Sequence, residues 1–222
     1  MVIIMKNLFR LDSPMMLFLS RVTDLIIVNL LFWLCCLPVI TIGASLAALH
    51  KVTQSMVLDE DGGVVKPFFR AFRDNFKQAT LGWLVLVVFL AGLGVDLMLS
   101  LSYLTGNTLT VCKWMIAILA CIILAISEYY FQLIVRYENT VRQHLTNAAI
   151  LALVKLPRTI VMIFLTLLPL LIALVSMNVF VSTMIFWVIL GFAFVSFIQS
   201  SLLRPVFRQL EKPEGPNVQL MD

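Results

Sequence analysis

An uncharged apolar run from Leu25 to Leu49 is the feature that most constrains this chain. Its 25 residues include no charged side chain and one asparagine, and Pro38 lies near its centre. At about 1.5 Å per residue, a helix of this length can cross a hydrocarbon core of roughly 30 Å. The run therefore predicts a chain embedded in a membrane. Pro38, followed by Thr41 and Gly43, predicts that this segment is more than a simple straight anchor.

The composition supports one integral membrane domain. The chain is 61% hydrophobic and only 13% charged, whereas soluble domains are roughly 25% charged. The net charge of +4 does not predict nucleic-acid binding, because the basic residues lie almost entirely between or beyond the apolar runs, as in membrane proteins. We expect the membrane domain to occupy residues 1–210 and residues 211–222 to form a disordered cytoplasmic tail.

The sequence predicts neither an enzyme nor a metal or cofactor protein. Its four cysteines lie in or at the edge of apolar segments without a CxxC motif, and His50 and His144 are isolated at segment edges. Phosphate-binding glycine loops, HExxH and GxSxG motifs are missing. We therefore assign no catalytic, cofactor-binding or metal-binding residue.

Four further apolar runs are each long enough to span a bilayer. They cover residues 80–103, 111–135, 159–177 and 179–203. The last two form one almost unbroken stretch that is about twice the thickness of the bilayer core, so the chain must fold back near Ser176. The fold class expected is an all-α polytopic transmembrane bundle.

The distribution of basic residues orients the runs, because short loops rich in Lys and Arg stay in the cytoplasm. Residues 51–77, residues 136–158 and the tail after residue 203 are basic, whereas the loops at 102–110 and 176–183 carry no charge. The C-terminus is therefore predicted to be cytoplasmic.

The first run conflicts with this scheme, because Lys6, Arg10 and Arg21 also favour a cytoplasmic location. One span cannot have both ends on one side. Either the N-terminus lies outside, which gives five spans, or a hairpin broken at Pro38 returns to the cytoplasmic face, which gives six. We favour five spans, with six as the alternative.

Two acidic residues lie inside the runs, where a charge costs about 2.5–3.5 kcal/mol. Asp96 follows two glycines in the second run, and Glu128 lies in the third, with Gln132 and Arg136 on the same helical face. Both acids are candidates for an ion or substrate path or for a polar contact with a partner. The alternative is structural: Asp96 is protonated or packed against the glycine-rich backbone, and Glu128 pairs with Arg136.

Residues Lys66–Lys77 are predicted to form an amphipathic helix along the cytoplasmic interface. Phe68, Phe72 and Phe76 recur every four residues, so they share one face. This helix can anchor the next span or dock a partner. Small residues at helix-packing spacing, such as Gly43 and Ala47, allow close helix contact within the chain or with another protein.

Three segments together resemble the YesL family of bacterial membrane proteins. These are residues 29–33 (NLLFW), residues 37–49 (LPVITIGA, then AAL at 47–49) and residues 68–78 (FFRAFRDNFKQ). The order and spacing match over about the first 80 residues. Beyond residue 80, the later apolar runs agree with the family only in number and placement.

The resemblance implies a bacterial plasma-membrane protein that accompanies a carbohydrate ABC importer, because members of the family are commonly encoded beside such importers. We therefore expect a non-catalytic accessory subunit or assembly factor that contacts permease subunits and membrane lipid. Direct sugar binding is not indicated. The alternative is an independent small transporter or channel that uses Asp96 and Glu128. The candidate partner-contact or packing residues are Pro38, Thr41, Gly43, Ala47, Phe68, Phe72, Asn75, Phe76, Glu128 and Gln132.

Overall fold

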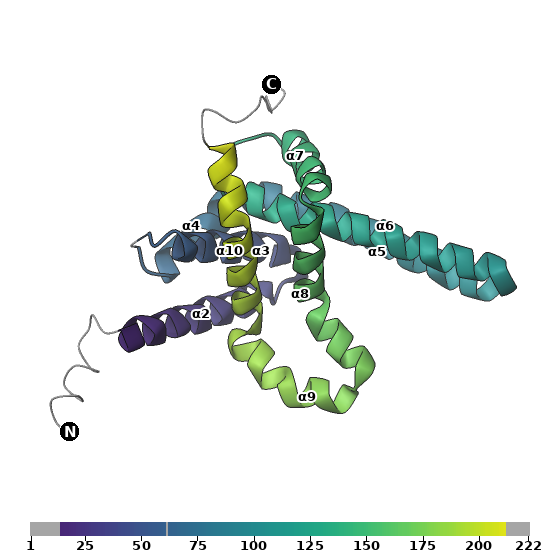
Figure 1. Cartoon of the computed structure of the whole chain (residues 1–222), viewed down its shortest axis with the longest axis horizontal. Coiled ribbons are helices and arrows are strands. Elements are labelled where there is room, and N and C mark those ends of the chain that lie inside the picture. The colour runs from purple at the N-terminus through teal and green to yellow at the C-terminus, as the bar shows by residue number, and fades with distance from the viewer. Residues whose placement is uncertain (1–13, 61, 212–222) are drawn as a thin grey trace.

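The computed structural model describes residues 14–60 and 62–211, and this part of the chain is helical without any strand. Its α-helices are α2 (Pro14–Cys36), α3 (Ile42–Val57), α4 (Val65–Asp74), α5 (Phe76–Tyr103), α6 (Gly106–Leu133), α7 (Val141–Val154), α8 (Leu156–Val175), α9 (Met177–Phe186) and α10 (Phe192–Leu210) (Figure 1). A 3₁₀ turn (Val39–Thr41) precedes α3, and a π-helical turn (Trp187–Gly191) joins α9 to α10. The predicted all-α class is confirmed.

Five helical segments are long and apolar enough to cross a membrane, which agrees with the expected number. They are Met15–Cys36, Phe76–Tyr103, Gly106–Leu133, Leu156–Val175 and Met177–Leu210. The first differs from the run read from the sequence, because it ends at Cys36 and does not continue to residue 49. Lys6 and Arg10, which contributed to the charge conflict, lie outside the described residues.

The chain reverses direction at Pro38, so residues 25–49 form part of a hairpin of α2 and α3 and not one straight span, although α3 is not among the five segments of spanning length. Thr41 stabilises the turn through its hydroxyl, which donates to the carbonyl oxygen of Cys35 or Pro38 at 2.6 and 2.7 Å. An ion pair between Arg21 and Asp59 joins α2 to the end of α3. The returning helix α3 is about 24 Å long, shorter than the hydrocarbon core, so it is not one of the five apolar spans.

Helix α3 is the centre of the fold. It contacts α2, α4, α5, α6 and α10, and most of its residues are buried. Small side chains make this possible: Ala44, Ala47 and Ala48 are fully buried, and a Cβ at Gly43 would lie 2.3 Å from the carbonyl oxygen of Ala79 in α5. The partner that approaches Gly43 is therefore a helix of the same chain.

Helix α4 is amphipathic, but it ends at Asp74 and does not continue to Lys77 as predicted. Asn75 separates it from α5, which begins at Phe76. Phe68 is fully buried against α3, whereas Phe69 is 45% exposed. The helix thus uses one ring for internal packing and leaves another ring free on its surface.

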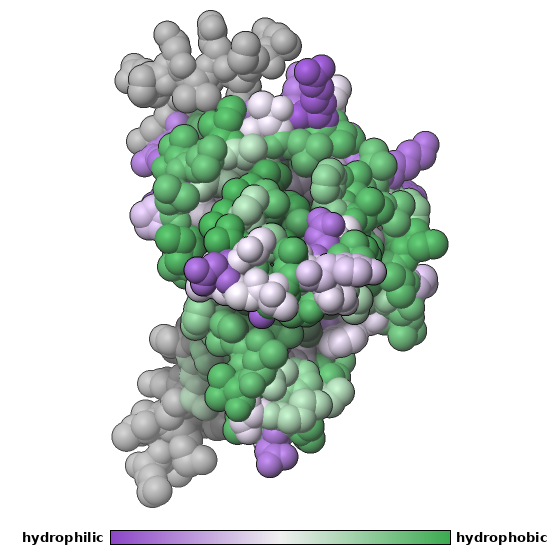
Figure 2. Space-filling model, turned by 90° about the vertical axis from the view of Figure 1, so that its right-hand side faces the viewer, coloured by the Kyte–Doolittle hydropathy of each residue, from purple (hydrophilic) through white to green (hydrophobic). Residues whose placement is uncertain are grey.

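Helices α5 and α6 form a long antiparallel hairpin that projects from the rest of the fold (Figure 1). Near its base, Gly82 gives room for the ring of Tyr130, whose hydroxyl donates to the carbonyl oxygen of Gln78 at 2.7 Å. Beyond Leu90 most residues of both helices are exposed. Figure 2 looks at this side of the molecule and shows a largely hydrophobic surface.

The C-terminal helices form a second, more open hairpin (Figure 1). The chain turns at Ser176, as the sequence indicates, between α8 and α9. The side chain of Asn29 in α2 is fully buried and bonds to the backbone of the π-helical turn. This contact joins the first span to the last.

Candidate functional site

A buried polar cluster lies where α6, α8 and α10 meet. The hydroxyl of Thr166 in α8 donates to Oε1 of Glu128 at 2.6 Å, and the side-chain amide of Gln199 in α10 donates to Oε2 at 3.0 Å. The same amide lies 2.8 Å from the Thr166 hydroxyl. Each carboxylate oxygen of Glu128 therefore accepts one hydrogen bond from a different helix.

A second polar cluster joins α3 to α10. Ser196 Oγ lies 2.9 Å from Nδ1 of His50 and 2.8 Å from the hydroxyl of Thr53, which also lies 3.0 Å from the hydroxyl of Ser200. All four side chains are buried. Ser196 and Ser200 share one face of α10 because they are four residues apart.

A cavity of about 320 Å³ lies beside both clusters. Glu128, Gln199, His50 and Ser196 contribute polar groups to its lining. Aromatic side chains from five positions complete much of the wall: Phe32, Trp83, Phe131, Trp187 and Phe192. Pockets of this size that are mostly apolar, with a few convergent polar groups, are typical small-molecule sites. The cavity is therefore the principal candidate site in the described chain.

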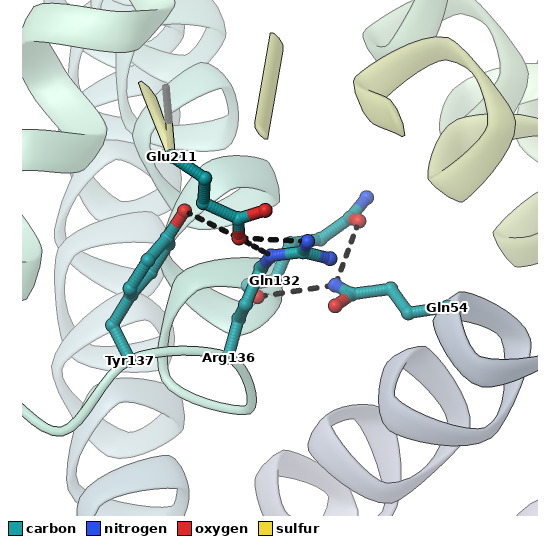
Figure 3. Close-up of polar contacts among 5 residues, drawn as sticks. All are labelled: Gln54, Gln132, Arg136, Tyr137 and Glu211. Carbon is teal, nitrogen blue, oxygen red and sulfur yellow. Dashed lines mark hydrogen bonds and ion pairs between the residues drawn. The ribbon is translucent and has the colours of Figure 1, made fainter. Parts of the chain in front are cut away.

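Polar contacts continue from α6 toward the end of α10 (Figure 3). The side-chain amide of Gln54 donates to the carbonyl oxygen of Gln132 at 3.1 Å and lies 3.3 Å from its Oε1. Farther along, Arg136 pairs with Glu211 at 2.8 Å and packs over the ring of Phe207 at 4.6 Å.

These contacts correct two expectations. Glu128 does not pair with Arg136, because α6 ends at Leu133 and the following turn directs Arg136 to Glu211. Glu211, which was assigned to a disordered tail, is the C-cap of α10 and forms this ion pair. The remainder of that tail, 212–222, lies outside the described residues.

Asp96 belongs to a different part of the molecule. It is exposed on α5, and a Cβ at Gly92 or Gly94 would meet no atom within 4 Å. Counted from the tip of the α5–α6 hairpin, Asp96 and Glu128 are separated along it by about 22 Å at 1.5 Å per residue. The structure therefore does not bring the two intramembrane acids together.

The remaining candidate residues lie in the turn at Pro38, in α3 and around the end of α4. Pro38 is exposed at the turn, where the indole of Trp83 donates to the carbonyl oxygen of Val39 at 3.1 Å. Ala47 belongs to the core. In α4, Phe72 packs partly buried against the ring of Phe76, 5.7 Å away.

A wide cleft of about 1160 Å³ lies between α4 and the segment after α6. Charged side chains of both signs line it, among them Lys66, Arg70, Asp74 and Glu138. Asn75 lies in the same lining, and its side-chain amide donates to the carbonyl oxygen of Ala71 at 3.0 Å. The cleft leaves the charged face of α4 accessible.

Sequence reasoning missed most of the polar interior. Thr166 and Ser196 are single polar residues in long apolar runs, and Gln199 begins a short polar stretch with Ser200 and Ser201. No local pattern relates any of them to Glu128 or His50. The signal was weak but present: Ser196, Gln199 and Ser200 fall on one helical face, which is unusual for a span surrounded only by lipid. No group of three or more His, Cys, Asp or Glu residues that could hold a metal ion occurs within residues 14–60 and 62–211.

The fold is that of a multi-pass helical membrane protein, with five apolar helical segments of spanning length. Residues 25–97 match the family described as Protein of unknown function, DUF624. The match covers the second half of α2, the turn at Pro38, α3, α4 and most of α5. No curated protein and no solved structure matches the chain.

Proposed function

We propose that this chain is a YesL-type accessory subunit, or an assembly factor, of a bacterial carbohydrate ABC importer. In this role it catalyses no reaction and binds importer permease subunits within the plasma membrane, with its C-terminus in the cytoplasm. The resemblance of residues 29–33, 37–49 and 68–78 to the YesL family supports the importer association. The matched region, residues 25–97, contains all three segments.

The observation that carries this proposal is the exposed face of α5 around Asp96. Gly92 and Asp96 are one helical turn apart, so they share a face, and that face is open to close approach. A carboxyl group exposed to lipid is costly. A neighbouring transmembrane helix that donates a hydrogen bond or carries a basic group would offset this cost, while glycine permits close backbone approach.

The exposed side of α4 provides a second surface for the same partner. Phe69 and Val65 are 45% and 47% exposed, and Lys66 and Arg70 line the open charged cleft. A partner bound to α5 within the membrane can therefore also contact α4 through a cytoplasmic loop. Phe68 is excluded from this contact because it is fully buried.

An independent transporter using both Asp96 and Glu128 receives less support. Glu128 faces a cavity, which favours ligand binding at that position. Asp96, however, is exposed on α5 and does not line that cavity, so the two acids do not line one path through this chain. Transport by the purified protein alone, lost in both Asp96→Asn and Glu128→Gln, is the result that would favour this alternative.

Affinity purification in a gentle detergent, followed by mass spectrometry, tests the proposed association. The wild-type protein should recover importer permease subunits. Gly92→Leu should reduce their recovery at least tenfold, because a leucine there obstructs the proposed contact face.

Gly94→Leu is the matched control. It introduces the same side chain into equally open space, but two residues correspond to about 200° around a helix, so it changes the opposite side. It should leave permease recovery unchanged. Recovery of the wild-type protein without permease subunits, or equal loss in both variants, would contradict the proposal.

A further inference from the structure

We infer that the cavity beside Glu128 binds an apolar organic cation. The ammonium group of such a ligand lies against the Glu128 carboxylate, and its hydrocarbon body lies among the aromatic side chains of the wall. This inference is independent of the proposed importer association, which depends on the exposed surfaces of α5 and α4.

The charges around the cavity favour a cation. Glu128 is the only acid that lines it, and no Lys or Arg is present among the described lining residues. Glu128 is 8% exposed, so it is largely removed from water. A carboxylate in such surroundings is stabilised by a positively charged partner, and the described residues place none in the lining.

The hydrogen-bond geometry of Glu128 leaves room for this partner. A carboxylate has about four lone-pair positions. Thr166 uses one position on Oε1, and Gln199 uses one on Oε2. Both oxygens therefore keep a free position, and the two neighbouring donors hold the carboxylate in place before a ligand arrives.

The aromatic wall suits the remainder of the ligand. The rings of Phe32 and Phe192 lie 5.6 Å apart, and those of Trp187 and Phe192 lie 5.8 Å apart. Aromatic faces attract cations by about 0.5–2 kcal/mol each, with tryptophan the strongest, and they also bury hydrocarbon. The volume of about 320 Å³ accommodates a single-ring amine.

A neutral sugar fits this chemistry poorly. Its many hydroxyl groups each require a partner when they are buried. The polar groups of the wall are already engaged: Ser196 lies within hydrogen-bond distance of His50, and Gln199 lies within hydrogen-bond distance of both Glu128 and Thr166. The cavity thus offers a carboxylate and aromatic surface but few free polar groups.

The cavity is accessible from the surface of the chain. Thr166 of α8 lines it and is itself exposed on the surface of the chain. Pro169, one turn farther along α8, lines the same cavity. A ligand that partitions into the membrane can therefore reach Glu128 without unfolding the helices.

Binding can be measured by isothermal titration calorimetry on the full-length protein in detergent, with benzyltrimethylammonium as the probe. We expect saturable binding, and at least tenfold weaker binding of the uncharged isostere neopentylbenzene. Glu128→Gln should weaken binding of the cation at least tenfold, because it removes the charge and retains the shape. Glucose should not bind.

Two further variants test whether the probe binds in this cavity and not elsewhere on the protein. Asp96→Asn removes the acid of α5, which does not line the cavity, and should leave binding of the probe unchanged. Leu86→Phe adds volume to the lining without changing Glu128, and it should abolish binding. Thermal melting of each variant verifies that it folds. If Glu128→Gln fails to fold, Leu86→Phe decides the question.

Several results would overturn the inference. These are absence of benzyltrimethylammonium binding, unchanged binding in a folded Glu128→Gln or Leu86→Phe protein, equal loss in Asp96→Asn, and glucose binding that exceeds binding of the cation. Loss of permease recovery in the purification experiment would bear only on the importer proposal.

Discussion

Asn29 in α2 holds the π-helical turn that begins at Trp187. Its side-chain amide nitrogen lies 3.2 Å from the carbonyl oxygen of Trp187 and 2.6 Å from that of Val188, while its oxygen accepts from the backbone nitrogen of Ala193 at 2.9 Å. A π-helical turn interrupts the regular hydrogen bonds of a helix. One buried side chain therefore satisfies backbone groups that lipid cannot.

Asn29→Leu should destabilise the protein by about 2 kcal/mol, because hydrogen bonds inside membrane proteins contribute about 0.6 kcal/mol each and three of them are lost. Thermal melting in detergent provides the measurement. Asn178→Leu, at an exposed position, is the control and should change stability little. Equal melting temperatures for Asn29→Leu and the wild type would show that the turn needs no side-chain support.

Gly43→Ala should destabilise the protein by about 1–3 kcal/mol, because an added Cβ lies 2.3 Å from the carbonyl oxygen of Ala79 and forces α3 and α5 apart. Gly94→Ala is the same change in open space and should be neutral or stabilising by up to about 1 kcal/mol. Comparison of the two melting temperatures tests the close crossing directly. An unchanged melting temperature in Gly43→Ala would show that α3 and α5 do not cross closely at this position.

We predict that acid destabilises the protein, because the imidazole of His144 is buried. His144 lies in α7, outside the five apolar spans, and it is 1% exposed with no hydrogen-bond partner for either ring nitrogen among the described residues. Burial lowers the pKa of its imidazole. The unfolded chain therefore binds a proton near pH 6.5 that the folded chain does not, so stability falls as the pH drops through that value.

The melting temperature should decrease between pH 7.5 and pH 5.5, and the decrease should be smaller in His144→Leu. Detergent-solubilised protein in buffers of constant ionic strength is suitable. An identical pH dependence in the wild type and the variant would assign the effect to other groups.

The α2–α3 hairpin predicts that Leu17 and Glu60 face the same side of the membrane, because the Arg21–Asp59 ion pair joins the two helices near these positions. Single cysteines at 17 and 60, in a protein whose native cysteines are replaced by serine, should react with a membrane-impermeant maleimide only after the cells are permeabilised. Labelling of position 17 in intact cells would place the start of α2 outside.

Apolar length predicted the long helices well, because it is a local signal. The turn at Pro38 was also visible, since proline disfavours helix in the residue before it. The choice between one span and a hairpin required tertiary contacts, such as Arg21 with Asp59.

The polar interior could not be predicted in the same way. Glu128 was identified as a candidate, but its partners Thr166 and Gln199 are 38 and 71 residues away in sequence. The predicted pairing of Glu128 with Arg136 was wrong, because α6 ends at Leu133 and the side chain of Arg136 turns to Glu211. Asn29 was visible as the one asparagine in its run, yet its role depends on a π-helical turn that no sequence pattern indicated.

Site-specific photo-crosslinking in intact cells can detect the proposed contact between α5 and an importer permease subunit. A photoreactive p-benzoylphenylalanine placed at position 92 should crosslink to an importer permease subunit, and the same group at position 94 should not. Crosslinks from position 92 only to lipid or to another copy of this chain, or equal permease crosslinks from both positions, would contradict the account.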